Sequence, residues 1–166
     1  MATEGDPRLA AVLALAGRRL GHSDWLEVTQ ERVDRFADAT GDHQWLHVDP
    51  QRARASRFGG TIAPGFLVLA LASPILAQLL RLPGYRTKVN YGCEWVRFLA
   101  PVPVGSRVRA RATVDAVDEA PGGVRLTVTL VYTVEGQRVP ACTARVLVLA
   151  YPDGWEGSGN PARADT

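Results

Sequence analysis

An aspartate and a histidine stand five residues apart in a segment that shows no helical or strand period. Asp42 follows Gly41, and His47 follows Trp45 and Leu46. A carboxylate and an imidazole aimed at one small volume can hold a water molecule and move one of its protons. An aspartate after glycine is also a common turn or cap residue, and a histidine beside apolar residues is often structural. The spacing by itself therefore leaves a catalytic and a structural interpretation open.

The elements before this pair are short. Residues 24–28 resemble a strand, and residues 30–40 predict an amphipathic helix that Thr29 caps and Gly41 ends. Residues 41–60 have no sustained period and are rich in turn formers, so we expect one long loop there. Long loops in small domains are often functional.

A long apolar segment follows the loop. Residues 62–80 are apolar on nearly every side, which predicts a central helix buried all round. Pro64 is tolerated in its first turn, whereas Pro74 should kink or break it.

The second half of the chain is strand-like. Four segments rich in Val, Thr, Leu and Tyr are separated by turn signals and predict antiparallel strands, at residues 85–98, 107–117, 124–134 and 138–151. Together with the helix they indicate an α+β class in one domain, residues 1–151, in which the sheet wraps around the helix. Such a sheet needs a cover for its edge, and dimerisation is a natural solution. Residues 152–166 are rich in Gly, Pro and polar residues and predict a disordered tail.

Composition excludes several classes of partner. The net charge of +2 comes from 19 basic and 17 acidic residues, too even for a nucleic-acid surface. The apolar run at residues 9–16 is too short to span a membrane and lacks a basic start, so we expect a docking helix and a cytoplasmic protein. Cys93 and Cys142 have no metal-binding spacing, and we expect two buried free thiols rather than a disulfide.

Three motifs resemble the MaoC-like hydratase family, in particular its nodulation-protein-N-like subgroup. The family pattern Gly-Asp-x-Asn-Pro-[Ile/Leu/Val]-His-x-Asp corresponds here to Gly41-Asp42-His43-Gln44-Trp45-Leu46-His47-Val48-Asp49. The stretch that opens the family's central helix corresponds to Ile62-Ala63-Pro64-Gly65-Phe66. The family's strand end corresponds to Arg97-Phe98-Leu99-Ala100-Pro101-Val102-Pro103-Val104-Gly105-Ser106. The resemblance covers roughly residues 24–150.

The resemblance implies a hot-dog fold, usually dimeric, in which an antiparallel sheet wraps a long central helix. It implies (R)-specific, reversible addition of water to trans-2-enoyl-CoA without a metal or redox cofactor. Asp42 and His47 would be the catalytic pair, and the Gly65 N–H would donate to the thioester oxygen. Ser73 would assist the aspartate, although a structural hydroxyl before Pro74 is an equal alternative.

Three departures from the family pattern affect the expected substrate pocket. Gln44 replaces the usual Asn, Trp45 replaces the usual Pro and could wall the pocket, and Pro64 replaces a His that is not catalytic. Alternatives therefore stay open. They are a dehydratase of a specialised or carrier-bound thioester, a non-catalytic thioester-binding subunit, and an acyl-CoA thioesterase. The last usually needs an acid or Gln in the central helix, where residues 62–77 have neither. Whether the carrier is coenzyme A or acyl carrier protein is also open.

Overall fold

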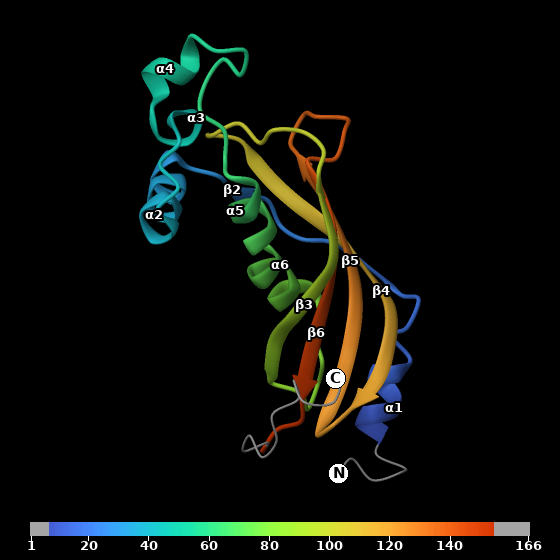
Figure 1. Cartoon of the computed structure of the whole chain (residues 1–166). Coiled ribbons are helices and arrows are strands. Elements are labelled where there is room, and N and C mark those ends of the chain that lie inside the picture. Colours follow the sequence, from blue (N-terminus) through green and yellow to red (C-terminus); the bar gives the residue numbers. More distant parts are fainter. Residues whose placement is uncertain (1–6, 155–166) are drawn as a thin grey trace.

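One antiparallel sheet organises the protein in the computed structural model, which describes residues 7–154 (Figure 1). The strands are β1 (Arg19–His22), β2 (Leu26–Glu27), β3 (Thr87–Phe98), β4 (Arg107–Ala120), β5 (Gly123–Val134) and β6 (Cys142–Tyr151). Their order is β1-β4-β5-β6-β3, and β2 also pairs with β4. The four predicted strands are confirmed. The predicted strand at residues 24–28 is shorter than expected, and β1 precedes it.

Strict alternation decides which face of the sheet is buried. Along β5 every second residue is buried, so Leu126, Val128 and Leu130 point inward while Thr127 and Thr129 point outward. An inward row of this kind buries apolar surface on one face and leaves the other to water. The outward face carries threonine and paired charges. The concave face is therefore the one that receives the central helix.

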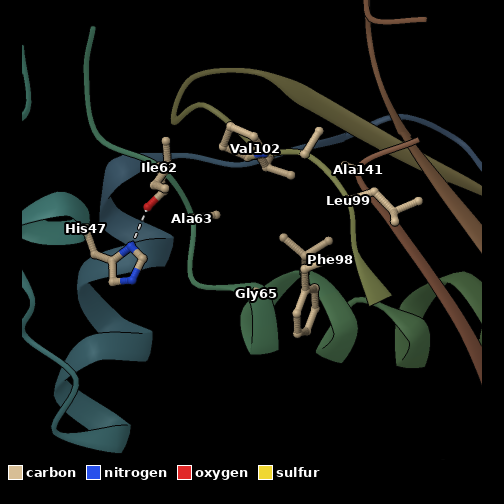
Figure 2. A pocket seen from close by; sticks show the side chains of 11 residues that line it. His47, Ile62, Ala63, Gly65, Phe98, Leu99, Val102 and Ala141 are labelled. Atoms are coloured by element: carbon tan, nitrogen blue, oxygen red, sulfur yellow. Dashed lines mark hydrogen bonds between the residues drawn. The ribbon is translucent and has the colours of Figure 1, made fainter. Parts of the chain in front are cut away.

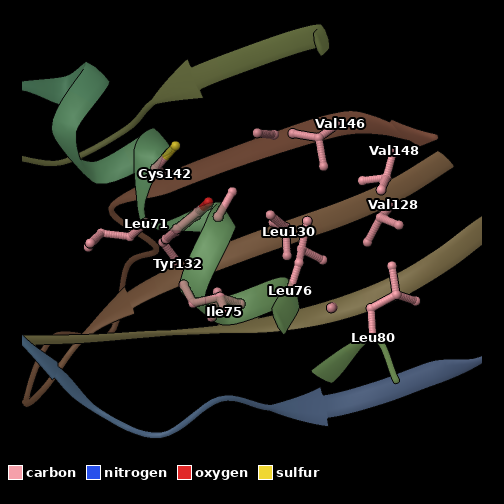
Figure 3. Packing of buried hydrophobic residues seen from close by; sticks show 14 of the residues in the cluster. Leu71, Ile75, Leu76, Leu80, Val128, Leu130, Tyr132, Cys142, Val146 and Val148 are labelled. Carbon is pink, nitrogen blue, oxygen red and sulfur yellow. The ribbon is translucent and has the colours of Figure 1, made fainter. Parts of the chain in front are cut away.

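The central helix is divided into two pieces, as Pro74 predicts. α5 (Gly65–Ala70) and α6 (Ala72–Leu79) meet at Leu71. Pro74 has no N–H to donate to the Ala70 carbonyl four residues earlier, and its ring crowds that carbonyl. The predicted break is thus confirmed, and it lies one turn before the proline that causes it. Leu71, Ile75 and Leu76 pack against the inward rows of β5 and β6 (Figure 3).

The prediction that this helix is buried on every side is wrong. Phe66 is 67% exposed, and Ala70, Ser73, Pro74 and Ala77 are exposed as well. The sheet curves around one side of the helix, so the other side is left open within residues 7–154. Packing against the sheet of the same chain therefore does not account for the apolar residues on the exposed side of this helix.

Three short helices gather at one end of the molecule, beyond the start of α5 (Figure 1). α2 (Gln30–Thr40) begins at Thr29, whose hydroxyl accepts from the Arg32 N–H, and ends at Gly41 with φ 76°, as predicted. The predicted long loop contains α3 (Trp45–Val48) and α4 (Pro50–Arg54), so it is better described as a helical segment. Both helices are too short to give a 3.6-residue hydrophobic period.

The predicted N-terminal helix is present, and the two cysteines differ from each other in burial. α1 (Pro7–Leu13) docks through the buried side chains of Leu9 and Val12. No helix among the described residues is long and apolar enough to cross a membrane. Both cysteines are free, but only Cys142 is buried; Cys93 is exposed because β3 is an edge strand. Of the predicted tail, residues 155–166 lie outside the described part of the chain.

Candidate active site

A cavity of about 300 Å³ lies where the helical end of the molecule meets the sheet (Figure 2). His47 from α3, Gly65 and Val68 from α5, and Phe98 at the end of β3 line it. The Ile62 and Ala141 loops close its other sides. All but the histidine are apolar or glycine, so the cavity offers a hydrophobic lining with one titratable side chain.

The orientation of His47 is fixed by a backbone carbonyl. Its Nδ1 lies 2.6 Å from the Ile62 carbonyl oxygen, and only 9% of its side chain is exposed (Figure 2). A carbonyl oxygen can only accept, so Nδ1 carries the hydrogen and Nε2 of the neutral ring keeps its lone pair. His47 therefore presents a proton acceptor away from Ile62.

Asp42 faces that acceptor from the end of α2. Its Oδ2 lies 3.9 Å from His47 Nε2, too far for a direct hydrogen bond. A water oxygen about 2.8 Å from each atom can lie beside the pair. The Gln44 side-chain N–H donates to the other oxygen of Asp42 at 3.2 Å, which leaves Oδ2 available. The predicted pair is therefore brought together, with Gln44 as its neighbour.

Gly65 is the first residue of α5, where backbone N–H groups have no partner inside the helix. The Phe98 ring lies against it. A methyl group added at Gly65 would be 3.1 Å from three atoms of that ring. Phe98 also meets the exposed Phe66 edge to face, with ring centroids 5.7 Å apart. The glycine thus allows an aromatic wall to stand directly over the start of the helix.

Two predicted site residues lie elsewhere. Ser73 is exposed and lines a separate cavity of about 360 Å³ between the central helix and β3, where it accepts from the Asn90 side-chain N–H at 3.2 Å. Trp45 does not line the cavity that holds His47, and the Arg52 guanidinium lies over its ring, 4.7 Å from the ring centroid. Gly65 lies eight residues, about two helical turns, before Ser73, and the break at Leu71 lies between them.

Other titratable groups near the cavity have structural roles. The Asp49 carboxylate accepts from the Arg52 N–H at 2.9 Å and caps α4. Burial raises the pKa of the Cys142 thiol to about 11, so this core cysteine stays protonated near neutral pH. The Asp38 carboxylate accepts a hydrogen bond from the ring of the exposed His43 and raises the pKa of that histidine. Neither cysteine nor His43 lines the cavity.

Sequence reasoning missed two residues of the site. The Ile62 carbonyl orients His47, and the Phe98 ring forms one wall of the cavity. Both residues stand inside motifs that were recognised. Their roles depend on a backbone group and on an approach between distant segments, and neither leaves a signal in residue type or spacing.

Known proteins resemble this chain over most of its length. Residues 12–135 match the family described as MaoC like domain. The chain is 50% identical over 141 residues to 3-hydroxyacyl-thioester dehydratase Z of Mycobacterium tuberculosis, an alignment that covers 84% of this chain and 93% of that protein. It is 40% identical over 147 residues to nodulation protein N of Rhizobium meliloti, covering 86% and 90%.

Solved structures share the fold. The (R)-hydratase from A. caviae involved in PHA biosynthesis superposes with a TM-score of 0.67 at 28% identity, covering 80% of this chain and 94% of that one. The sheet wrapped around a central helix is thus the predicted hot-dog fold. Together with the family match over most of the chain, these likenesses establish that this protein belongs to the MaoC-like family of hydratase and dehydratase enzymes.

Proposed function

We propose that the protein catalyses the reversible addition of water to the double bond of a trans-2-enoyl thioester, giving the (R)-3-hydroxyacyl thioester. The observation that carries this proposal is the approach of Asp42 Oδ2 and His47 Nε2, 3.9 Å apart, beside an apolar cavity. Two acceptors that share one water can orient it and remove a proton from it.

The hydrogen bond of His47 suggests how the two groups divide the work. Because Nδ1 is occupied by the Ile62 carbonyl, Nε2 takes one water proton as the water oxygen bonds to C3. The same proton is then delivered to C2, and Asp42 accepts the hydrogen that stays on the new hydroxyl. Both additions come from one side of the double bond. Dehydration follows the same steps in reverse.

The negative charge that develops when the electron pair leaves the double bond must be stabilised. It moves onto the thioester oxygen, and we propose that the Gly65 N–H donates to that oxygen. Removing such a donor typically costs about 2.7–4 kcal/mol of activation free energy. The thioester already acidifies C2, so the proposed steps use side chains and one backbone group, without a metal or redox cofactor.

The substrate is further defined by its acyl group and by the thiol that carries it. One close relative is named a 3-hydroxyacyl-thioester dehydratase and another structure an (R)-hydratase, which favours a thioester over any particular acyl chain. A specialised or carrier-bound thioester is therefore the second candidate, with the same chemistry. Coenzyme A and acyl carrier protein both present such a thioester. A cytoplasmic location remains a prediction.

We also propose that two copies of the chain associate. In residues 7–154, β3 pairs with β6 on one side and has no strand on its other side. Val89 on this strand is 44% exposed and Phe98 is 45% exposed. An unpaired, partly apolar edge next to the open side of the central helix is the kind of surface that a second copy covers.

The test follows the loss of absorbance of the enoyl thioester with crotonyl-CoA and octenoyl-CoA. Asp42→Asn and His47→Gln should each lower kcat by roughly 100-fold or more, since general acid–base groups contribute that much. His22→Gln is the matched control, because His22 is an exposed histidine on β1.

Each result has a defined meaning. A wild-type protein that is folded and inert on both substrates would argue against simple enoyl-CoA hydration, and the acyl carrier protein thioesters would be assayed next. Full activity in either variant would remove that residue from the proposed mechanism.

A further inference from the structure

One side chain holds together the segments that carry the histidine and its acceptor. The Gln30 amide nitrogen, at the start of α2, donates to the His47 backbone carbonyl at 2.7 Å and to Asp34 Oδ1 at 2.8 Å. Its amide oxygen accepts from the Thr61 hydroxyl at 2.6 Å. A backbone carbonyl can only accept, so the amide can bind in one orientation alone.

The contacts of Gln30 lie on both sides of the hydrogen bond between the His47 ring and the Ile62 carbonyl. Thr61 directly precedes Ile62, whose carbonyl accepts from His47 Nδ1. Gln30 therefore holds the backbone of His47 with its nitrogen and the neighbour of Ile62 with its oxygen. One amide group therefore links the two segments that carry the ring and its acceptor. Thr61 is 7% exposed, so its hydroxyl is largely shielded from water and relies on this partner.

The helix that carries His47 is unable to fix it unaided. α3 has four residues and no side-chain cap at its N-terminus. A single helical turn is unstable without tertiary contacts. Apart from Gln30, the Ile62 N–H to Leu46 carbonyl bond, at 3.0 Å, ties this turn to the neighbouring segment. Small displacements of a catalytic group can cost about 100-fold in rate.

We propose that Gln30 is a positioning residue of the active site, which acts through His47 by keeping its Nδ1 on the Ile62 carbonyl and its Nε2 toward Asp42. The inference rests on the proposed function for its effect on rate. Its effect on the imidazole does not depend on which substrate the enzyme uses. Thr61 is the second member of the same unit.

The test combines kinetics with nitrogen NMR of the histidine rings. Gln30→Met keeps the length of the side chain and removes all three hydrogen bonds, whereas Thr61→Val keeps the shape and removes one. The chain has three histidines, so His47 is assigned by comparison with the His22→Gln and His43→Gln spectra. Gln78→Met is the matched control, because Gln78 on α6 binds the Asp24 N–H and carboxylate far along the chain from the site.

We expect Gln30→Met to lower kcat by at least about tenfold, as residues that orient an active group often do, with KM changed by less than about threefold. Its His47 nitrogen shifts should move from those of a ring protonated at Nδ1 toward those of a mixture of the two neutral forms. Thr61→Val should move both readings in the same direction by less. Combining it with Gln30→Met should add little, because both act as one unit.

Three outcomes would overturn the proposal. They are a Gln30→Met enzyme with wild-type kcat, a loss of kcat with unchanged His47 nitrogen shifts, and an equal loss in Gln78→Met. If Gln30→Met does not fold, Thr61→Val decides by the same two readings. A wild-type protein without hydratase activity would refute the proposed function, while the nitrogen shifts would still decide whether Gln30 positions His47.

Discussion

The start of the central helix leaves no room for a side chain, and this limits which residues can occupy position 65. Replacing Gly65 with Ala keeps the backbone N–H but places a methyl group 3.1 Å from three atoms of the Phe98 ring. The ring must shift, and with it one wall of the cavity. We predict a fall in kcat/KM of roughly 10- to 100-fold for crotonyl-CoA, measured by absorbance.

Gly92→Ala supplies the comparison for that prediction, because a methyl group there makes an ordinary contact, 3.6 Å from Leu147. Its kcat/KM should match that of the wild type. Restoration of activity by adding Phe98→Ala to Gly65→Ala would assign the loss to the ring. If Gly65→Ala is fully active, the cavity wall is more adaptable than the contact distance implies.

The loop beside Asp42 carries a pH-dependent ion pair. His43 Nε2 lies 2.9 Å from Asp38 Oδ1, and this hydrogen bond raises the pKa of His43 above its usual value of 6.5. A raised pKa means that the pair favours the folded state below pH 6.5, and that this contribution is lost as the pH rises through the raised pKa.

We predict that Asp38→Asn returns the pKa of His43 toward 6.5 in an NMR titration. Turnover should be unchanged at pH 7, because neither side chain lines the cavity. A titration curve identical to that of the wild type would show that Asp38 is not the cause.

At the residue scale, the sequence predicted that Asp42 and His47 lie close together, but it did not predict the contacts that hold His47 in place. Asp42, His47 and Gly65 were identified because the motif fixes both type and spacing. Gln30 lies 17 residues before His47 and 31 residues before Thr61. No local sequence pattern predicts hydrogen bonds over such separations. The resemblance implied that Ser73 assists Asp42, with a structural hydroxyl as the equal alternative, and in the structure Ser73 lines another cavity.

At the element scale, Asp49 has a structural role that differs from the role proposed for Asp42. Asp49 caps α4 through the Arg52 N–H. Asp49→Ala should lower the free energy of unfolding by about 1 kcal/mol, the usual value of a lost N-cap, in denaturant titrations. Asp49→Asn should restore the cap, since asparagine serves as well in that place.

Activity distinguishes the two roles of an aspartate at position 49. A capping residue tolerates Asn, so Asp49→Asn should keep a wild-type kcat, whereas Asp42→Asn should not. A large loss of kcat in Asp49→Asn would place this carboxylate in the chemistry.

The sequence predicted those helices and strands in which a hydrophobic period continues over many residues. β5 and β4 show two-residue alternation over most of their lengths, and the predicted strands agree with the observed ones. The helices α3 and α4 have four and five residues, too few to establish a helical period, so the sequence predicts a loop there. The sequence did predict the effect of Pro74, since its missing N–H acts on a neighbour four residues away.

At the scale of the whole molecule, the apolar composition of the central helix exceeds what one sheet can cover. The predicted burial on all sides would be recovered if a second copy lay against the open side of Phe66 and Ala70. An apolar helix surface exposed to water is otherwise unfavourable by roughly 25 cal/mol per Å². We therefore expect one association surface, made of the helix and of the edge of β3 that has no partner strand within residues 7–154.

Ala70→Glu tests that surface, because Ala70 is exposed in the single chain and glutamate is a good helix former. In a monomer the change should alter the free energy of unfolding by no more than about 0.5 kcal/mol. In a dimer it would bury an unpaired charge, so we predict that sedimentation equilibrium shows a dimer for the wild type and a monomer for Ala70→Glu. Ala39→Glu, on the exposed side of α2, is the control and should remain dimeric. A wild type that stays monomeric at every concentration, or an Ala70→Glu variant that dimerises like it, would mean that the open side of the helix is not where two copies meet.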